Sequence, residues 1–82
     1  MRSAVEISMY PLAESYRPRI QAFIDRLNTH PDLTVLTNTL STQIWGELER
    51  VMGVLAAEME RAAADGPQLV FVLKVLPGLA AP

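Results

Sequence analysis

The order in which hydrophobic periodicity changes along the chain is the feature that most constrains its fold. Residues 4–10 alternate between apolar and polar side chains, a period of two that predicts a half-buried strand ended by Pro11. The apolar residues that follow recur three and four positions apart, which predicts a helix: Ile20, Phe23, Ile24 and Leu27. Glu14 or Ser15 can cap this helix, and Pro18 is compatible only with its first turn.

After the His30-Pro31 pair, two short segments rich in threonine and branched residues predict a pair of strands, residues 33–38 and 40–45. Asn38-Thr39 is the expected turn between them, so the two strands form a hairpin. The sequence therefore predicts strand, helix, strand, strand for its first half.

A second helix is predicted over residues 47–65, where apolar residues again follow helical spacing: Leu48, Val51, Met52, Leu55, Met59 and Ala62. Glu58 is expected to lie off this stripe. Gly66-Pro67 closes the helix, because glycine supplies a positive φ and proline forbids continuation. Residues 69–75 are apolar on both faces, which indicates a last strand that is covered on both sides.

The resulting order, β-α-β-β-α-β, predicts an α+β, ferredoxin-like single domain over residues 1–82. Its four-stranded antiparallel sheet should carry both helices on one face, with Val5, Ile7 and Met9 beneath them. The opposite, open face should carry a mixture of apolar and polar side chains: Glu6, Ser8, Tyr10, Ser41, Gln43, Trp45, Val70, Val72 and Lys74. Such an exposed patch is typical of an interface or a binding surface.

Composition narrows the classes of partner. The net charge is −2 and the basic residues are scattered, so we expect no nucleic acid. No apolar run approaches the roughly 20 residues that span a bilayer, and the N-terminus does not resemble a secretory signal, so we expect no membrane association. The absence of cysteine fits a cytoplasmic protein. Half the residues are hydrophobic in a small domain, which favours a homodimer or homotetramer.

No catalytic set emerges, so the sequence predicts a protein that is not an enzyme and needs no cofactor or metal. There is no cysteine, no glycine-rich phosphate loop and no metal-ligand spacing. The only histidine, His30, is expected to be solvated. Gly46 is expected to give backbone freedom where strand becomes helix. The methionines are expected to fill the core: Met9, Met52 and Met59.

Residues 5–12 (VEISMYPL) and 37–47 (TNTLSTQIWGE) resemble the YkoF-type family, which binds thiamine or hydroxymethylpyrimidine. The most specific part is Thr42-x-x-x-Gly46 after Asn38-Thr39-x-Ser41, and the likeness extends to Gly66-Pro67 and Lys74. The resemblance implies a ferredoxin-like fold, assembly through sheet faces, and vitamin binding without catalysis, linked to thiamine uptake or salvage. Larger members carry two such domains, so a homodimer of this chain would supply the equivalent pair.

Two interpretations compete for the aromatic and charged residues of the open face. Glu6 can accept hydrogen bonds from an aminopyrimidine, or it can pair with Lys74 on the neighbouring strand. Tyr10 and Trp45 can stack on a planar ring or anchor a subunit interface. We favour the ligand for Tyr10 and the interface for Trp45, with Val70 and Val72 beside it.

The hairpin offers a row of neutral donors and acceptors that suit a pyrimidine edge or a hydroxymethyl group: Asn38, Thr39, Ser41, Thr42 and Gln43. Turn chemistry and helix capping are the competing explanation. The predicted ligand site combines this row with Ser8 and with the open-face residues Glu6, Tyr10 and Lys74. The competing hypothesis for the whole chain is a structural or regulatory oligomerisation module without a vitamin ligand.

Overall fold

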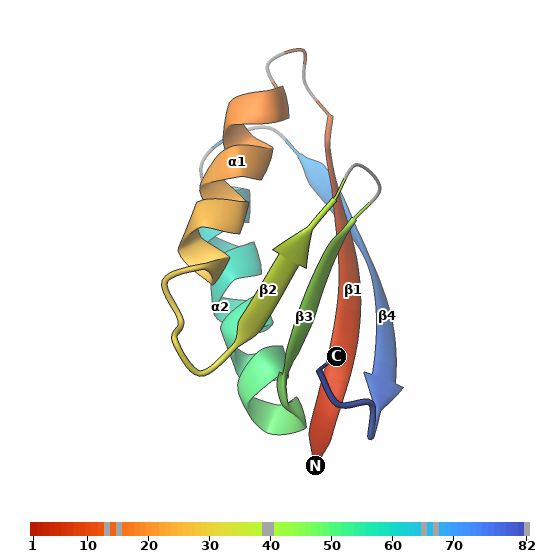
Figure 1. The fold of residues 1–82 in the computed structure, drawn as a ribbon. Coiled ribbons are helices and arrows are strands. Elements are labelled where there is room, and N and C mark those ends of the chain that lie inside the picture. The colour runs from red at the N-terminus through yellow and green to blue at the C-terminus, as the bar shows by residue number, and fades with distance from the viewer. Residues whose placement is uncertain (13, 15, 39–40, 65, 67, 82) are drawn as a thin grey trace.

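Two helices cover one face of a single antiparallel sheet whose strand order is β2-β3-β1-β4 (Figure 1). The elements are β1 (Arg2–Pro11), α1 (Tyr16–Leu27), β2 (Thr34–Thr37), β3 (Thr42–Glu47), α2 (Leu48–Ala64) and β4 (Leu69–Pro77). The computed structural model describes residues 1–12, 14, 16–38, 41–64, 66 and 68–81. The predicted βαββαβ ferredoxin-like fold is confirmed.

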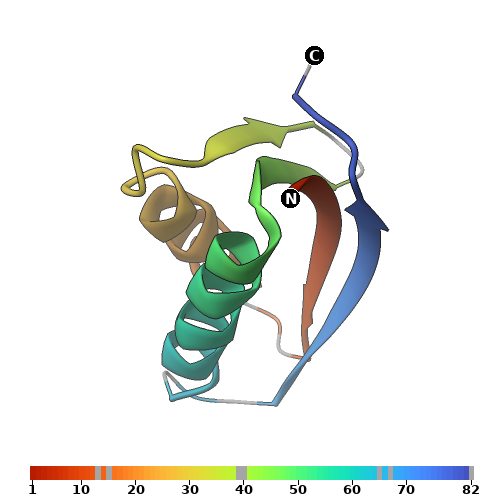
Figure 2. The ribbon, with the colours of Figure 1, turned by 90° about the horizontal axis from the view of Figure 1, so that it is seen from below.

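The strand β1 lies at the centre of the sheet and pairs antiparallel with both β3 and β4. Seen along the sheet, both helices lie on the same side, and the other face carries no helix (Figure 2). The first and last strands are therefore neighbours in space although almost the whole chain separates them. This arrangement leaves β2 and β4 as the two edges of the sheet.

The alternation along β1 sorts its side chains between the two faces, as predicted. Val5 and Ile7 are buried beneath the helices, and Met9 packs against the same core. Phe23 of α1 meets Phe71 of β4 with ring centroids 5.1 Å apart and planes tilted by 46°. The core therefore lies between the sheet and the helix pair, and its largest fully buried side chains include Phe23, Leu27, Ile44 and Leu55.

The hairpin strands differ from their predicted bounds. The second strand is shorter than residues 33–38, and the third lies two residues later than residues 40–45. The reason is the ladder with β1, in which Glu47 pairs with Arg2 and Gly46 with Ser3, so that the strand continues until the helix begins at Leu48. Local propensity does not contain this long-range pairing.

The ends of the remaining elements agree more closely with the sequence. Pro18 does lie in the first turn of α1, and α2 ends at Ala64, just before Gly66 with its φ of +143°. Ser15, Thr39 and Pro67 lie outside the described residues. The strands β1 and β4 are longer than predicted, because they pair with each other over nine positions up to Ser3 and Pro77.

The buried stripe of α2 differs from the predicted one, most clearly at Glu58 and Met52, and it also includes Val54. Glu58 is only 4% exposed, whereas Met52 is 37% exposed and does not fill the core as expected. The buried positions follow helical spacing one step away from Met52: Val51, Val54, Leu55, Glu58 and Ala62. Hydrophobicity alone assigns a methionine to the core before a glutamate, but the rotation of the helix against the sheet places Glu58 inside.

Gly46 is required for close packing rather than for backbone freedom, which corrects the prediction. It is a buried residue of β3 without a positive φ. A Cβ at this position would lie 2.7 Å from Leu33 Cδ2 and 3.0 Å from Val51 Cγ2. The loop before β2 and the first turn of α2 therefore approach the sheet through the space that the missing side chain leaves.

Gly46→Ala should lower the free energy of unfolding by about 1–3 kcal/mol, because Leu33 and Val51 must move to accept the methyl group. Gly53→Ala is the matched control: nothing lies within 4 Å of its Cβ, and it lies in α2. There the same substitution should raise stability by about 0.5–1 kcal/mol through helix propensity. Urea denaturation of both variants measures the difference, and equal effects would contradict it.

Candidate functional site

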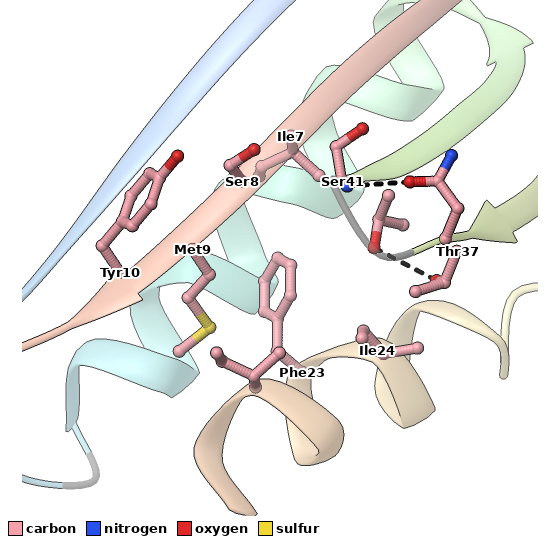
Figure 3. Close-up of a pocket in the computed structure, with 11 residues that line it drawn as sticks. Ile7, Ser8, Met9, Tyr10, Phe23, Ile24, Thr37 and Ser41 are labelled. Atoms are coloured by element: carbon pink, nitrogen blue, oxygen red, sulfur yellow. Dashed lines mark hydrogen bonds between the residues drawn. The ribbon is translucent and has the colours of Figure 1, made fainter. Parts of the chain in front are cut away.

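A gap between β1 and the β2–β3 hairpin forms the first candidate site. The ladder between β1 and β3 ends at the pair Ile7 and Thr42, whereas the ladder between β1 and β4 continues to Pro11 and Leu69. Among the described residues, which leave out 39 and 40 of the hairpin, residues 8–10 of β1 therefore have no ladder partner on the hairpin side. A cavity of about 200 Å³ opens at this place, beneath α1 (Figure 3).

The cavity has an apolar side and a polar side. Met9 of β1 and Phe23 and Ile24 of α1 lie on the helix side of the strand, while Ser8 and Tyr10 point to the other face (Figure 3). Because the sheet is interrupted there, side chains from both of its faces line the same space. The full lining is Ile7, Ser8, Met9, Tyr10, Ile20, Phe23, Ile24, Thr37, Asn38, Ser41 and Thr42.

Hydrogen bonds within the hairpin fix its side of the cavity. The Thr37 and Thr42 hydroxyl oxygens lie 3.1 Å apart across the β2–β3 ladder, and Thr42 is buried. The Ser41 backbone N–H donates to Asn38 Oδ1 at 3.1 Å, and the Asn38 N–H donates to the Ser41 carbonyl at 3.0 Å. The hairpin end is therefore held by its own polar groups while its side chains face the cavity.

A second, shallower site lies on the open face and is called here the Trp45 hollow. It has a volume of about 340 Å³ and is lined by Ala4, Val5, Glu6, Gln43, Trp45, Lys74, Leu76 and Leu79. The Lys74 ammonium lies 3.7 Å from Glu6 Oε1, and the Ser41 hydroxyl donates to Glu6 Oε2 at 3.1 Å. Ser41 thus connects the hollow to the cavity.

The structure divides the predicted ligand residues between these two sites. Ser8, Tyr10, Asn38, Ser41 and Thr42 line the cavity. Glu6, Gln43 and Lys74 line the hollow together with Trp45, which was predicted to be an interface residue. Val70 and Val72 are exposed on the open face, where they pair with Tyr10 and Ser8. Thr39 lies outside the described residues.

Sequence reasoning missed the apolar side of the cavity. Met9, Ile20, Phe23 and Ile24 were assigned to the strand and helix stripes that face the core, and nothing in their spacing separates core from cavity wall. Thr37 was placed in a strand without a further role. The relevant signal was the length of the strands, because a first strand longer than its hairpin partner must leave part of one edge unpaired.

A third cluster surrounds the buried Glu58 carboxylate in a groove of about 330 Å³. The Nε atoms of Arg26 and Arg61 lie 3.4 and 3.6 Å from Glu58 Oε1, and His30 Nε2 lies 3.4 Å from Oε2. The prediction that His30 is simply solvated is therefore wrong, because its ring contacts Glu58. Buried charges need such partners, and this cluster joins the end of α1 to α2.

The loop after α1 is fixed to α2 by an ion pair next to this cluster. Arg50 Nε donates to Asp32 Oδ2 at 2.7 Å, and Arg50 Nη2 lies 3.4 Å from His30 Nδ1. The hydrogen bond from Arg50 lowers the pKa of the Asp32 carboxyl below its usual value. Arg50 therefore connects the loop to the first turn of α2.

The described part of the chain has no group of three or more His, Cys, Asp or Glu residues that could hold a metal ion. Within the same residues, no helix has the length and apolar character needed to cross a membrane. The chemistry available in the cavity and the hollow is therefore that of hydroxyl, amide, carboxylate, ammonium and aromatic groups.

Three crystal structures have similar folds. A protein from Streptococcus pneumoniae superposes with a TM-score of 0.88 at 21% identity, over 96% of this chain and 89% of that one. A protein from Thermotoga maritima, provisionally named as a thiamine biosynthesis/salvage protein, superposes with a TM-score of 0.83 at 18% identity, over 93% of this chain and 83% of that one. A hypothetical protein from Methanocaldococcus jannascii superposes with a TM-score of 0.80 at 24% identity, over 90% of this chain and 77% of that one. At these identities the likeness shows the fold.

No protein-family model and no curated protein matches the chain. The comparisons that can be set beside the geometry of the sites are therefore those with solved structures. Among them, the name of the Thermotoga maritima protein refers to a vitamin, and a further neighbour from Bacillus cereus is a domain of unknown function.

Glu58→Gln should lower the free energy of unfolding by about 1–3 kcal/mol, because Arg26, His30 and Arg61 lose the buried carboxylate that they contact. Glu60→Gln on the exposed side of α2 removes the same charge without a buried partner and should change stability by less than about 0.5 kcal/mol. Chemical denaturation of the pair tests this. Equal stability of the two variants would mean that the cluster contributes nothing to folding.

Proposed function

We propose that this chain binds thiamine or its hydroxymethylpyrimidine moiety in the cavity beneath α1, without catalysis. The observation that carries the proposal is the end of β1 at residues 8–10, which has no hairpin-side ladder partner among the described residues and faces an apolar wall from α1. An unpaired strand edge presents backbone N–H and C=O groups. An aminopyrimidine offers a donor and an acceptor side by side, so it can hydrogen-bond to such an edge while its ring packs on the apolar wall.

The size of the cavity favours one ring over two. A volume of about 200 Å³ is below the roughly 300–1,000 Å³ of sites for drug-sized ligands. The pyrimidine would therefore be enclosed, between Met9, Phe23 and Ile24, and the thiazolium ring of thiamine would remain near the mouth. Ser41 lines the cavity and donates to Glu6 Oε2, so a carboxylate lies one hydrogen bond away from the lining. This charge suits a cationic ring at the mouth.

Several observations support binding rather than catalysis. The sole histidine, His30, contacts Glu58 in the groove between the helices and does not line the cavity. Among the described residues, the cavity lining has hydroxyl and amide groups from Ser8, Asn38 and Thr42 but no carboxylate or amine. The proposed role is in vitamin uptake or salvage in the cytoplasm, and the name of the Thermotoga maritima neighbour, which refers to thiamine biosynthesis or salvage, supports the salvage part of it.

The open face supports assembly into a homodimer or homotetramer. Large apolar side chains are exposed on it at Tyr10, Val70 and Val72, and Leu36 is exposed separately on the opposite edge strand β2. The pairing of Tyr10 with Val70 and of Ser8 with Val72 places the first three on adjacent strands. A contiguous apolar surface of this kind is typical of an interface. The same observation favours the second candidate function, an oligomerisation module that binds no vitamin.

Calorimetric titration of the full chain with thiamine and with hydroxymethylpyrimidine tests the proposed ligand. We expect saturable binding of both, and a loss of at least about tenfold, or 1.4 kcal/mol, for Ile24→Phe, whose added ring atoms occupy the cavity. Leu36→Phe makes a similar change at an exposed residue of β2 and should bind normally. No heat and no thermal shift at millimolar ligand would contradict vitamin binding.

Val72→Glu should convert the assembly to monomers, because it places a charge in the centre of the exposed apolar surface. Leu12→Glu, at an exposed residue after β1, should leave the assembly intact. Multi-angle light scattering after size exclusion gives both masses. If the unmodified chain is a monomer at every concentration, the predicted oligomer is wrong. If Val72→Glu dissociates an assembly that binds no vitamin, the oligomerisation module is the better description.

A further inference from the structure

The cavity beneath α1 and an exposed apolar part of the open face share a wall. Ser8 and Tyr10 line the cavity, and both side chains point away from α1 (Figure 3). In the sheet Tyr10 pairs with Val70 and Ser8 with Val72. Tyr10, Val70 and Val72 are 53%, 44% and 50% exposed, and they are called here the Tyr10 patch. A body that packs on this patch therefore contacts the same tyrosine that bounds the cavity.

The chain itself partly covers the other end of the open face. Ala4 and Trp45 lie on that face but are only 5% and 7% exposed, and they share the Trp45 hollow with Leu79. After β4 the chain turns and runs back over this end of the sheet (Figures 1 and 2). The end that the Tyr10 patch occupies is therefore the more accessible one for a partner.

The Tyr10 patch and the charges beside it form a surface that is complementary to itself. Glu6 of β1 pairs with Lys74 of β4, in line with the pairs of the patch, and their charged atoms lie 3.7 Å apart at 37% and 75% exposure. A half-turn about an axis that runs between these two strands, parallel to them, places each residue of β1 over its β4 partner in a second copy. Glu6 then faces the partner's Lys74, and Tyr10 faces the partner's Val70. A two-fold interface requires this self-complementarity.

We propose that a second copy of the chain docks face to face on the Tyr10 patch and completes the vitamin cavity, so that vitamin binding and self-association strengthen each other. The partner's Val70 would pack on Tyr10 and close the cavity on its open-face side. The proposal rests on the proposed function for its ligand. It goes further because a cavity and an interface that shared no residue would act independently.

The coupling has a quantitative consequence. If the assembled chain binds the vitamin more tightly by some factor, the bound vitamin must tighten self-association by the same factor. A factor of at least about ten is expected, within the usual range of such couplings. Analytical ultracentrifugation with and without saturating hydroxymethylpyrimidine measures the effect on assembly, and calorimetry at protein concentrations above and below the dissociation constant measures the effect on binding.

A monomeric variant tests the same coupling if the assembly is too tight to dilute apart. Val72 does not line the cavity among the described residues, so Val72→Glu leaves the lining unchanged while it disrupts the interface. We expect this variant to bind hydroxymethylpyrimidine at least about tenfold more weakly than the unmodified chain. Leu12→Glu adds the same charge at an exposed residue outside the patch and should bind it normally.

Charge reversal tests the face-to-face arrangement itself. Glu6→Lys and Lys74→Glu each place like charges across the interface, so each variant alone should be a monomer. An equimolar mixture of the two should assemble, because opposite charges then meet between the chains. Within each chain the pair stays like-charged, so the recovery reports contacts between copies. Glu60→Lys and Arg17→Glu make the same changes of net charge on exposed helix residues and should each assemble alone.

The outcomes separate this proposal from the proposed function. If Val72→Glu and the unmodified chain bind hydroxymethylpyrimidine equally, the coupling is wrong and vitamin binding stands. If neither binds it, the proposed function fails and the coupling with it. The arrangement is also wrong if the unmodified chain is always a monomer, if the single charge variants assemble like the unmodified chain, or if their mixture stays monomeric.

Discussion

The two-sided pairing of β1 is the interaction on which the rest of the structure depends. This strand joins β3 on one side and β4 on the other, so it connects the first residues of the chain to the hairpin and to the last strand. Its alternation then decides what each face of the sheet carries. Val5 and Ile7 bind the helices through the core, and Glu6 and Tyr10 leave the opposite face half polar and half apolar. A shift of one residue would exchange the two faces.

The unequal lengths of the two ladders produce the cavity. Among the described residues, β3 pairs with β1 as far as Thr42, whereas β4 continues to Leu69, so the ladder pairs at the end of β1 are those with β4. The helix α1 packs over the core-facing side of this end with Ile20, Phe23 and Ile24. A fully paired sheet would have no space here. The candidate ligand site is therefore a consequence of strand length, and its polar groups come from the hairpin that ends early.

The sequence predicted the fold because periodicity is local, and it failed where the outcome depended on distant packing. The alternation of Val5 and Ile7 needs no partner to be recognised, and neither does the stripe of Phe23 and Leu27. The burial of Glu58 depends on Arg26, and its exchange with Met52 depends on how α2 is rotated. For the same reason the predicted ligand residues were assigned to one surface, whereas the gap between β1 and the hairpin divides them between the cavity and the Trp45 hollow.

Glu58 and Glu6 each contact several side chains, but Glu58 is buried and Glu6 is not. This difference decides how much the contacts of each carboxylate contribute to stability. Glu58 is enclosed by three basic side chains, so its charge cannot be redirected without exposing the core. Glu6 contacts Lys74 at 3.7 Å where the two side chains are 37% and 75% exposed, and exposed pairs of this kind are worth little. The pair therefore adds little to stability, and the closer contact of Glu6 is the Ser41 hydroxyl, which donates to Oε2 at 3.1 Å. Removing Lys74 would thus leave Glu6 with a hydrogen-bond donor, whereas Glu58 depends on its basic neighbours because it is buried.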